Sequence, residues 1–552
     1  FPCLCTPDEN TNAIIGSNHN ITLNQSGSVR NLTIQDNASL NSTESFDLNI
    51  SGDFFISSNN PNPLTLGNQT LILNGSGDQE LALNNEELYH LMIDKPGGMI
   101  LLAEPMSLLG TLSFLTATEF ASNGNLTLIS TSDGTDNNAS IGTIPNGGSV
   151  IGDVTVQRFV SGEGEIWRYL SSPVANASIA DWQDDFPITG NFDDPSSGPG
   201  INSNRPSLFL YGESGSGTDK QLGWLAYPTS GSASDNLIVP GAGYSALIIG
   251  GESPTVIEVT GPINQGGFGF NVSFAGSGWN LLGNPYPATI DWGNPVGWSN
   301  TDLANAIYIR NNENGNSNSV IASYVDGVGT NGGTGLIATG QSFWVQAIGA
   351  NPSLSINERA KSGTTGVFFR NQTPDNLFRI RLTSQSQFDE AVIRFRTDAT
   401  SGYDPQFDAK KFKNGTINLA SFVEDPEQSM AINTLPELTE SVRVQLALSD
   451  IKPSNCSLLF SELNKLNLPY SIHLIDHHID SVLLVTDSTS YDFTTDSIPG
   501  SYQQRFELRI DLKEAPAAEA LPSLNELAMY PNPVSGFLNI VDPGPGNNTS
   551  LV

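Results

Sequence analysis

The stretch LTLGNQTLILNGSGDQELAL, residues 64–83, holds three short apolar runs, LTL, LIL and LAL, each with leucine at its first and third positions. Side chains that share one face of a β-strand recur at every second residue, so this spacing indicates strands with one buried face. The Asn, Gly and Asp residues between the runs are typical of turns. The stretch therefore predicts very short strands joined by tight turns.

Similar triplets recur from about residue 14 to residue 160. They include LTI (32–34), LNI (48–50), LMI (91–93), LSF (112–114), LTL (126–128) and VTV (154–156). Many short strands at loosely regular spacing favour a solenoid of stacked rungs, with Asn and Thr at the corners. Because the spacing is irregular, a β-sandwich remains the alternative for residues 1–152.

The rest of the chain also predicts β-structure, so the expected fold class is all-β and multidomain. Residues 153–370 contain all seven Trp residues and predict an aromatic-rich antiparallel domain. Residues 371–513 alternate between polar and apolar positions, as in RVQLALSD (443–450), and predict a β-sandwich. Residues 514–526 are rich in Ala, Pro and Glu, which predicts a linker, and residues 527–552 form a last unit.

Composition excludes several classes of function. The chain has 57 Asp and Glu against 23 Lys and Arg, a net charge of −34, and this field repels nucleic-acid phosphates. We therefore expect no nucleic-acid partner. No run of 18 apolar residues occurs, so we expect no membrane span. Three Cys residues are too few for a disulfide scaffold.

Motifs of catalysis are scarce, and we expect no enzyme activity. The sequence contains no HExxH, no GxxxxGK[ST] and no GxSxG. Paired carboxylates at Asp184 and Asp185, and at Asp193 and Asp194, leave a glycoside hydrolase as a remote alternative. Paired Asp residues flanked by Pro, Gly and Ser are more typical of a solvated loop.

Two segments suggest metal ligands. SIHLIDHHIDS (471–481) could supply two His residues, His473 and His477, and one carboxylate, but it fits a strand, a turn and the start of a second strand better. DGTDNN (133–138) offers Asp133 and Asp136 as Ca²⁺ ligands, although it lacks the Gly and the distal Glu of a Ca²⁺-binding loop. Ca²⁺ is thus the one candidate cofactor.

Four aromatic residues in turn-rich segments are candidate glycan contacts. Trp224 and Tyr227 lie in QLGWLAYP (221–228), and Trp292 and Trp298 lie in IDWGNPVGWSN (290–300). An aromatic face suits the apolar C–H patches of a sugar ring. A carbohydrate-binding accessory protein is therefore an alternative function, whereas Trp279 and Trp344 lie in strand-like runs and are expected in the core.

The segment YPNPVSGFLNI (530–540), which follows the Ala/Pro linker, resembles the start of the type A C-terminal sorting domain of type IX secretion cargo in Bacteroidota. VTVQRFVSGEGEIWRYLSSPV (154–174) and GSGWNLLGNPYPATIDW (276–292) are also similar to segments of such secreted proteins. The resemblance implies a Pro-Asn-Pro turn and then a strand from Gly536 to Ile540. It assigns the sorting motif to Tyr530, Pro531, Asn532, Pro533, Gly536, Leu538 and Ile540. The later strands of such a domain are missing, so we expect a truncated one.

The resemblance implies a secreted or cell-surface protein that is recognised by the type IX machinery. We expect a structural or adhesive role, with either another copy of the chain, assembled into a fibre, or a surface polysaccharide as partner. The triplets DSV, DST and DSI also resemble the export-linked O-glycosylation motif of Bacteroidota. They make Ser481, Ser488 and Ser497 candidate glycosylation sites.

Overall fold

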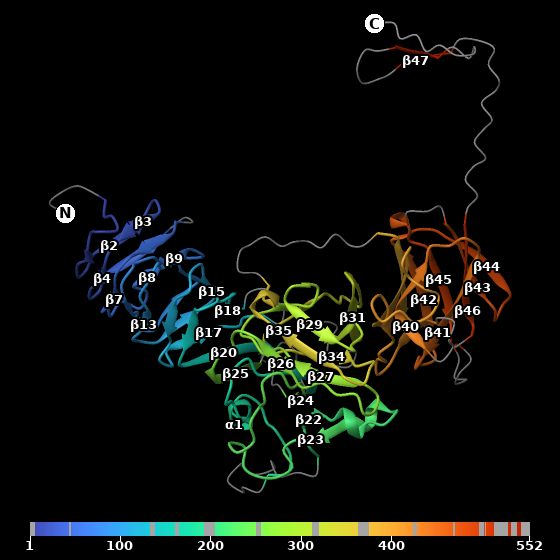
Figure 1. Cartoon of the computed structure of the whole chain (residues 1–552), viewed down its shortest axis with the longest axis horizontal. Coiled ribbons are helices and arrows are strands. Elements are labelled where there is room, and N and C mark those ends of the chain that lie inside the picture. The colour runs from blue at the N-terminus through green and yellow to red at the C-terminus, as the bar shows by residue number, and fades with distance from the viewer. Residues whose placement is uncertain are drawn as a thin grey trace.

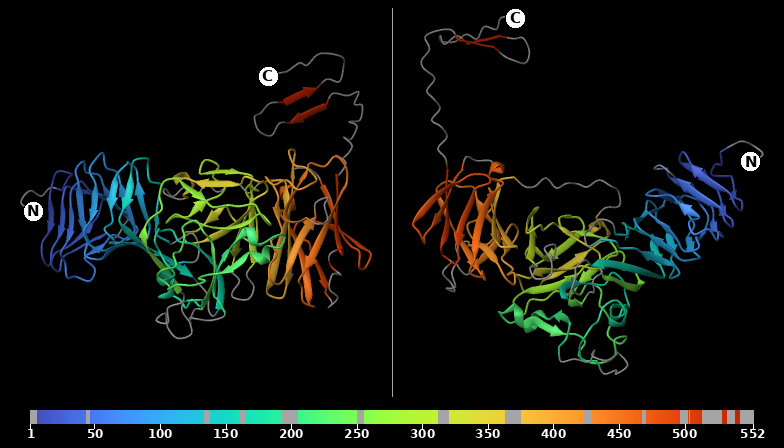
Figure 2. Two further views of the ribbon diagram at one scale, coloured as in Figure 1. Left: turned by 60° about the horizontal axis from the view of Figure 1, so that its bottom comes forward. Right: turned by 180° about the vertical axis from the view of Figure 1, so that it is seen from behind.

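The computed structural model describes most of the chain, and the described part is almost entirely β-structure (Figure 1). The described residues are 6–42, 46–132, 138–160, 165–192, 205–249, 255–311, 320–362, 375–422, 428–466, 470–495, 502, 504–512 and, by their strands alone, 528–531 and 538–541. A solenoid, a middle domain and a third domain follow one another along an elongated body (Figures 1 and 2). The predicted all-β, multidomain fold is confirmed.

The first unit is a solenoid with three parallel faces. Its first face contains β1 (Ala13–Ile15), β4 (Leu32–Ile34), β7 (Phe54–Ile56), β10 (Gln79–Ala82), β13 (Ile100–Leu102), β16 (Glu119–Ala121) and β19 (Ser149–Ile151). The second face is divided into two sheets. The first holds β2 (Asn20–Leu23), β5 (Ser39–Ser42) and β8 (Leu64–Thr65), and the second holds β11 (Glu86–Leu88), β14 (Met106–Leu108), β17 (Leu126–Leu128) and β20 (Asp153–Val160). The third face contains β3 (Gly27–Val29), β6 (Leu48–Ile50), β9 (Thr70–Leu73), β12 (His90–Ile93), β15 (Thr111–Phe114) and β18 (Ser140–Ile141).

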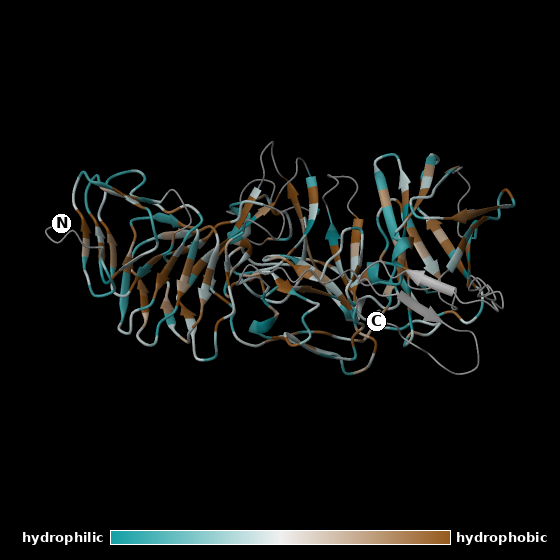
Figure 3. Ribbon diagram, turned by 90° about the horizontal axis from the view of Figure 1, so that it is seen from above, coloured by the Kyte–Doolittle hydropathy of each residue, from teal (hydrophilic) through white to brown (hydrophobic). Residues whose placement is uncertain are grey.

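The triplets form these strands because their first and third residues enter the core. In β4, Leu32 and Ile34 are buried and Thr33 between them is half-buried. Apolar residues accordingly gather on the strands, and hydrophilic residues gather at the turns (Figure 3). Asn residues at the corners adopt left-handed backbone angles, for example Asn37 at φ 54° and Asn123 at φ 52°, a conformation that Asn tolerates better than most residues. The solenoid prediction is confirmed over the sandwich alternative.

One strand continues from the solenoid into the sheet structure of the middle domain. β20, the last strand of the second face, pairs in antiparallel register with β25 (Thr255–Pro262). One sheet holds β21 (Glu165–Leu170), β24 (Tyr244–Ile249), β22 (Leu208–Tyr211) and β23 (Trp224–Ala226). A second holds β27 (Trp279–Gly283), β34 (Ser342–Gln346), β30 (Ile307–Asn311), β31 (Val320–Val325) and β32 (Val328–Thr330). The short elements are β26 (Phe268–Phe270), β28 (Ile290–Asp291), β29 (Trp298–Thr301), β33 (Leu336–Ile337), β35 (Ser353–Ile356), helix α1 (Ile179–Gln183) and the 3-10 turns η2 (Glu213–Gly215), η3 (Lys220–Gly223) and η4 (Glu358–Ala360).

The third domain is one sheet that curls around its own core. The strand order is β44 (Ser481–Val485), β43 (Tyr470–Asp476), β46 (Phe506–Leu512), β41 (Val442–Ser449), β39 (Asn418–Phe422), β40 (Ser429–Pro436), β37 (Gln387–Arg396), β36 (Leu377–Ser384), β42 (Asn455–Ser461) and β45 (Ser490–Thr494), with β38 (Ala409–Lys410) on β40 and the turn η5 (Leu463–Lys465) after β42. Phe493 of β45 and Phe506 of β46 touch inside the curl, with ring centroids 4.8 Å apart. The apolar positions of the predicted alternation thus face the interior of a curled, sandwich-like sheet.

The segment after the third domain contains β47 (Ala528–Pro531) and β48 (Leu538–Val541), which pair in antiparallel register. Among the helices that the structure describes, none combines the length and the apolar character needed to cross a bilayer.

Candidate functional site

A pocket of about 520 Å³ lies in the middle domain, and two of its lining residues, Asn305 and Asp326, contact the third domain. Its size falls in the range of small-molecule sites, roughly 300–1,000 Å³. The lining residues come from the β28–β29 segment, the loop before β30 and the β31–β32 hairpin. They are Trp292, Gly293, Asn294, Pro295, Trp298, Asn300, Asn305, Tyr324, Asp326 and Gly327.

Two indole rings form the apolar wall of this pocket, and both are held in place. The Trp292 and Trp298 rings lie 4.7 Å apart between centroids, at an angle of 60°. The Trp292 Nε1–H donates to the carbonyl of Asn305 at 2.8 Å, and the Trp298 Nε1–H donates to the carbonyl of Asp291 at 2.8 Å. Trp292 is only 7% exposed, whereas Trp298 is half-buried. Trp298 therefore offers the larger accessible surface of a rigid aromatic wall.

Amide side chains form much of the polar rim. Asn300 is exposed, while Asn294 donates to the carbonyl of Arg359 at 2.6 Å. Asn305 donates through its side chain to the carbonyl of Gln406 in the third domain at 3.3 Å. A side-chain amide carries both donors and an acceptor, so it can satisfy a hydroxyl group in either role.

The one carboxylate among the lining residues is Asp326, in the turn between β31 and β32. Its Oδ2 accepts hydrogen bonds from Arg394 Nη1 at 2.8 Å and from Arg396 Nη1 at 2.9 Å. Both arginines belong to β37 of the third domain, so this ion pair spans the domain boundary. Asp326 and Gly327 have positive φ angles, 46° and 82°, which suits the two central positions of a tight hairpin turn.

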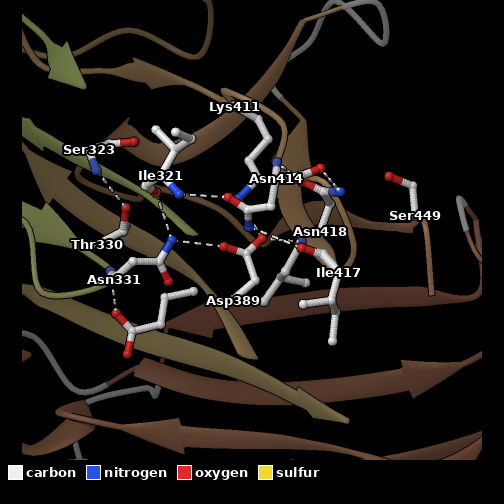
Figure 4. Close-up of polar contacts among 12 residues, drawn as sticks. Ile321, Ser323, Thr330, Asn331, Asp389, Lys411, Asn414, Ile417, Asn418 and Ser449 are labelled. Atoms are coloured by element: carbon white, nitrogen blue, oxygen red, sulfur yellow. Dashed lines mark hydrogen bonds and ion pairs between the residues drawn. The ribbon is translucent and has the colours of Figure 1, made fainter. Parts of the chain in front are cut away.

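A buried polar network fixes the same hairpin against the third domain (Figure 4). Asn331, which follows β32, donates through Nδ2 to Asp389 Oδ1 at 2.9 Å and to the carbonyl of Ile321 at 2.9 Å. Asp389 is fully buried, and its Oδ2 also accepts from Lys411 and, at 2.6 Å, from the backbone N–H of Leu419. The hairpin that supplies Asp326 is therefore tied to the third domain at two places.

The other two aromatic candidates do not line this pocket. Trp224 packs against Tyr211 and Trp344, with ring centroids 5.3 and 5.6 Å away, because β23 pairs with β22 beside that aromatic cluster. Tyr227 is half-buried and donates its hydroxyl to the carbonyl of Leu237 at 2.7 Å.

Two further tryptophans, Trp279 and Trp344, were expected in the core. Trp279 lies in β27 and Trp344 in β34, and both are buried. That prediction is confirmed.

The acidic candidates divide between the exposed surface and a half-buried position. Asp184 is exposed, and burial raises the pKa of Asp185 to about 6, with Asp184 and Glu258 adding like charge. Asp185 Oδ2 accepts the backbone N–H of Glu258 at 2.7 Å, so the carboxylate has a structural contact. Asp193 and Asp194 lie outside the described residues.

The histidine-rich segment forms the strand, turn and strand that the sequence favoured, with β43 and β44 around residues 477–480. Asp476 is buried and bound by Arg505, whose Nη2 lies 2.8 Å from Oδ2. The two histidines have other neighbours. His473 Nδ1 lies 3.5 Å from Asp511 Oδ2, and His477 Nε2 lies 3.6 Å from Glu507 Oε2. Among the described residues, no three His, Cys, Asp or Glu side chains lie close enough together to hold a metal ion.

The remaining candidates come from the Ca²⁺ loop, the glycosylation motif and the sorting motif. Ser481 begins β44 and is half-buried, and Ser488 is exposed with φ 67°. Tyr530 and Pro531 end β47, and Leu538 and Ile540 lie in β48, so Pro531 belongs to a strand rather than to the expected turn. Outside the described residues lie Asp133, Asp136, Ser497, Asn532, Pro533 and Gly536.

Comparison with known proteins gives one family. A family model described as domain of unknown function DUF8693 matches residues 111–510. The chain belongs to the DUF8693 family. No curated protein and no solved structure matches. The DUF8693 match runs from β15 to β46 and so contains the whole pocket and the domain boundary, whereas β1 to β14 and the β47–β48 hairpin lie outside it.

The sequence alone did not identify the polar residues that line the Trp292–Trp298 pocket. Asn300, Asn305 and Asp326 lie in polar turns that resemble many others in this Asn-rich chain. The Asp-Gly pair at 326–327 does signal a tight turn. Only the pairing of β31 with β32 and the contact with β37 bring that turn to the two tryptophans.

Proposed function

We propose that this protein is an extracellular adhesive protein that binds a neutral glycan in the Trp292–Trp298 pocket. One observation carries the proposal: two fixed indole rings stand beside amide side chains in a pocket of about 520 Å³. Aromatic faces pack against the C–H patches of sugar rings, and amides exchange hydrogen bonds with sugar hydroxyls. A rigid wall also lowers the ordering cost of binding.

The charge of the pocket favours a neutral ligand. Asp326 is the one carboxylate among the lining residues, and Arg394 and Arg396 already compensate its charge. Glycoside hydrolysis ordinarily uses two carboxylates on either side of the bond that breaks. A single carboxylate held by two guanidinium groups supports binding without cleavage.

Export through the type IX pathway is part of the proposal, and it rests on the resemblance of residues 530–540 to a sorting domain. Ser481 and Ser488 are then the described candidates for O-glycosylation, Ser488 being the more exposed. Intact mass spectrometry of native extracellular material tests this part. We expect a mass above that of the polypeptide because of attached glycan, and we expect the added mass to be smaller in Ser488→Ala. Absence of the protein from the cell surface and the medium would contradict it.

A glycan array with the full chain tests the binding function. We expect wild-type protein to bind one or more neutral glycans and Trp298→Ala to lose that signal. Trp224→Phe is the matched control, because Trp224 packs in the aromatic core away from the pocket. Binding that persists unchanged in Trp298→Ala would contradict the assignment.

A second candidate function, self-assembly into a fibre, is favoured by the geometry of the solenoid. Within the described residues its three faces end at the edge strands β1, β2 and β3. An edge strand presents unpaired N–H and C=O groups to which another chain can add. Ile14 of β1 is also 58% exposed. Size-exclusion chromatography and negative-stain imaging test the idea: we expect concentration-dependent filaments that Ile14→Lys weakens, and a monomer at every concentration would contradict it.

A further inference from the structure

One edge of the third-domain sheet is open to another strand. β44 stands at the end of the strand order, and within the residues that the structure describes it pairs with β43 on one side alone. Alternate residues of such a strand point their backbone N–H and C=O groups away from the sheet, where another strand can pair with them. The sheet can therefore grow by one strand at β44.

The side chains of β44 leave this edge unprotected. The strand has the sequence SVLLV, without a charged residue, a proline or a glycine. Val482 is 57% exposed, Leu484 is 52% exposed, and Ile479 in the preceding turn is 59% exposed. Natural edge strands are commonly protected by charges, prolines or bulges. At the other end of the strand order, the exposed positions of β45 are polar: Ser490, Asp492 and Thr494.

We propose that β44 pairs with β44 of a second copy of this chain, in antiparallel register about a two-fold axis at Leu483. In this register Val482 of each copy lies opposite Leu484 of the other. Directly opposite residues of an antiparallel pair place their side chains on the same face and in contact. The pairing thus covers both exposed apolar side chains and makes one sheet continuous through two copies. Such an interface closes on itself and gives a dimer.

The charges around β44 favour a second copy as the partner. The chain has a net charge of −34, so most surfaces of two copies repel each other, whereas β44 carries no charge. The two-fold register directs Asp480 of one copy toward Thr486 of the other, and Asp487 toward the turn that holds His478. All four residues are exposed. A hydroxyl and an imidazole N–H can both donate to a carboxylate, so each acidic group meets a donor.

The two described candidates for O-glycosylation lie at the ends of this strand. Ser481 is its first residue, and Ser488 follows it after two residues and is exposed. A glycan on Ser488 would occupy space that the other copy needs, so glycosylation and pairing would exclude each other. The full chain for the experiment is therefore prepared in a host that does not glycosylate it. The pairing itself does not rest on the proposed glycan binding or export.

Sedimentation velocity of the full chain at increasing concentration tests the pairing, in about 0.15 M salt to screen the net charge. The parent for all measurements is Ile14→Lys, so that association through the solenoid contributes least. We expect a monomer–dimer equilibrium, and slower hydrogen exchange of the backbone amides in residues 481–485 when the dimer forms. A monomer up to the solubility limit would overturn the proposal and leave the edge to an extended segment of another protein. A dimer without slower exchange in β44 would overturn it as well.

Two variants locate the interface in β44. Val482→Lys and Leu484→Lys change exposed positions, so each should fold as the parent does, which circular dichroism checks. Each should weaken dimerisation at least about tenfold, because the two-fold axis places two lysines against apolar side chains. Ser355→Lys is the matched control, since Ser355 is an exposed strand position of the middle domain. Dimerisation that both β44 variants leave unchanged, or that Ser355→Lys weakens equally, would contradict the assignment.

The dimer and the proposed glycan binding are tested independently. No residue of β44 lines the tryptophan pocket, which is formed around Trp292 and Trp298. Val482→Lys should therefore keep its neutral-glycan binding, and Trp298→Ala should keep its dimerisation.

Discussion

Asn331 donates a 2.9 Å hydrogen bond to Asp389 across the boundary between the middle and third domains. Asn331 follows the β31–β32 hairpin, and the turn of that hairpin supplies Asp326 to the tryptophan pocket. Asp326 in turn binds Arg394 and Arg396 of β37. The boundary contacts and the pocket are therefore parts of one rigid arrangement, and loosening the boundary should weaken ligand binding.

The boundary contact predicts a loss of stability in Asn331→Gly. Glycine tolerates the φ of 54° at this position, so the substitution removes the side-chain contacts without adding backbone strain. One oxygen of the buried Asp389 then loses a partner, which should cost about 1–3 kcal/mol. Urea unfolding followed by Trp fluorescence measures this, because all seven Trp residues lie in the middle domain.

Asn85→Gly is the control for that experiment. Asn85 also has a positive φ, 65°, but it is exposed on the solenoid. It should unfold nearly as wild type does. An Asn331→Gly variant that matches Asn85→Gly would show that the boundary contact contributes little.

The solenoid contains a buried cation, and its removal should destabilise the rungs. Lys95 is 1% exposed and donates to the carbonyls of Gly75 at 2.9 Å and Gly77 at 2.7 Å, and to Gln79 Oε1 at 2.7 Å. Lys95→Met keeps the bulk of the side chain but leaves these acceptors unpaired, so we expect a loss of about 3 kcal/mol.

Urea unfolding followed by far-ultraviolet circular dichroism measures that loss, because Trp fluorescence does not report on the solenoid. Lys452→Met, at an exposed position of the third domain, is the control and should be near neutral. A Lys95→Met variant as stable as the control would mean that water satisfies these acceptors equally well.

The raised pKa of Asp185 predicts that the stability of the protein depends on pH. Burial raises its pKa to about 6 in the folded protein, above the value near 3.9 of an unfolded chain. The folded state therefore binds more protons between about pH 4 and pH 6, so this group's contribution to stability falls as pH rises through that window and is fully lost above it.

Asp185→Asn keeps an acceptor for the Glu258 N–H but carries no charge. Differential scanning calorimetry should show it melting about 2 °C above wild type near pH 8, a shift kept small by partial solvent screening, and close to wild type near pH 4. Asp184→Asn, at an exposed neighbour, should shift less at both pH values. Equal shifts at the two pH values would show that ionisation of Asp185 is not the cause.

The sequence predicts the solenoid because each triplet is a local pattern, but it does not predict the register of the rungs. Leu32 pairs with Phe54, and Phe54 pairs with Leu81, so successive steps differ in length. The loops between strands vary in length, so the repeat in the sequence is irregular although the strands still pair from one rung to the next.

The tryptophan pocket is only partly predictable for a similar reason. Trp292 and Trp298 stand out by residue type. Asn305 and Asp326 reach the pocket through pairing and domain contacts that no short stretch encodes. The same limit explains Trp224: nothing local reveals that β23 turns it toward Trp344.

Isothermal titration of a neutral oligosaccharide, chosen on the glycan array, into the full chain tests the proposed function most directly. We predict saturable binding by wild type and by Trp224→Phe, at least about tenfold weaker binding by the surface variant Asn300→Ala, and none by Trp298→Ala. Circular dichroism of each variant confirms that it is folded. Wild-type affinity in folded Trp298→Ala and Asn300→Ala, or no saturable binding of any neutral oligosaccharide by wild type, would contradict the account.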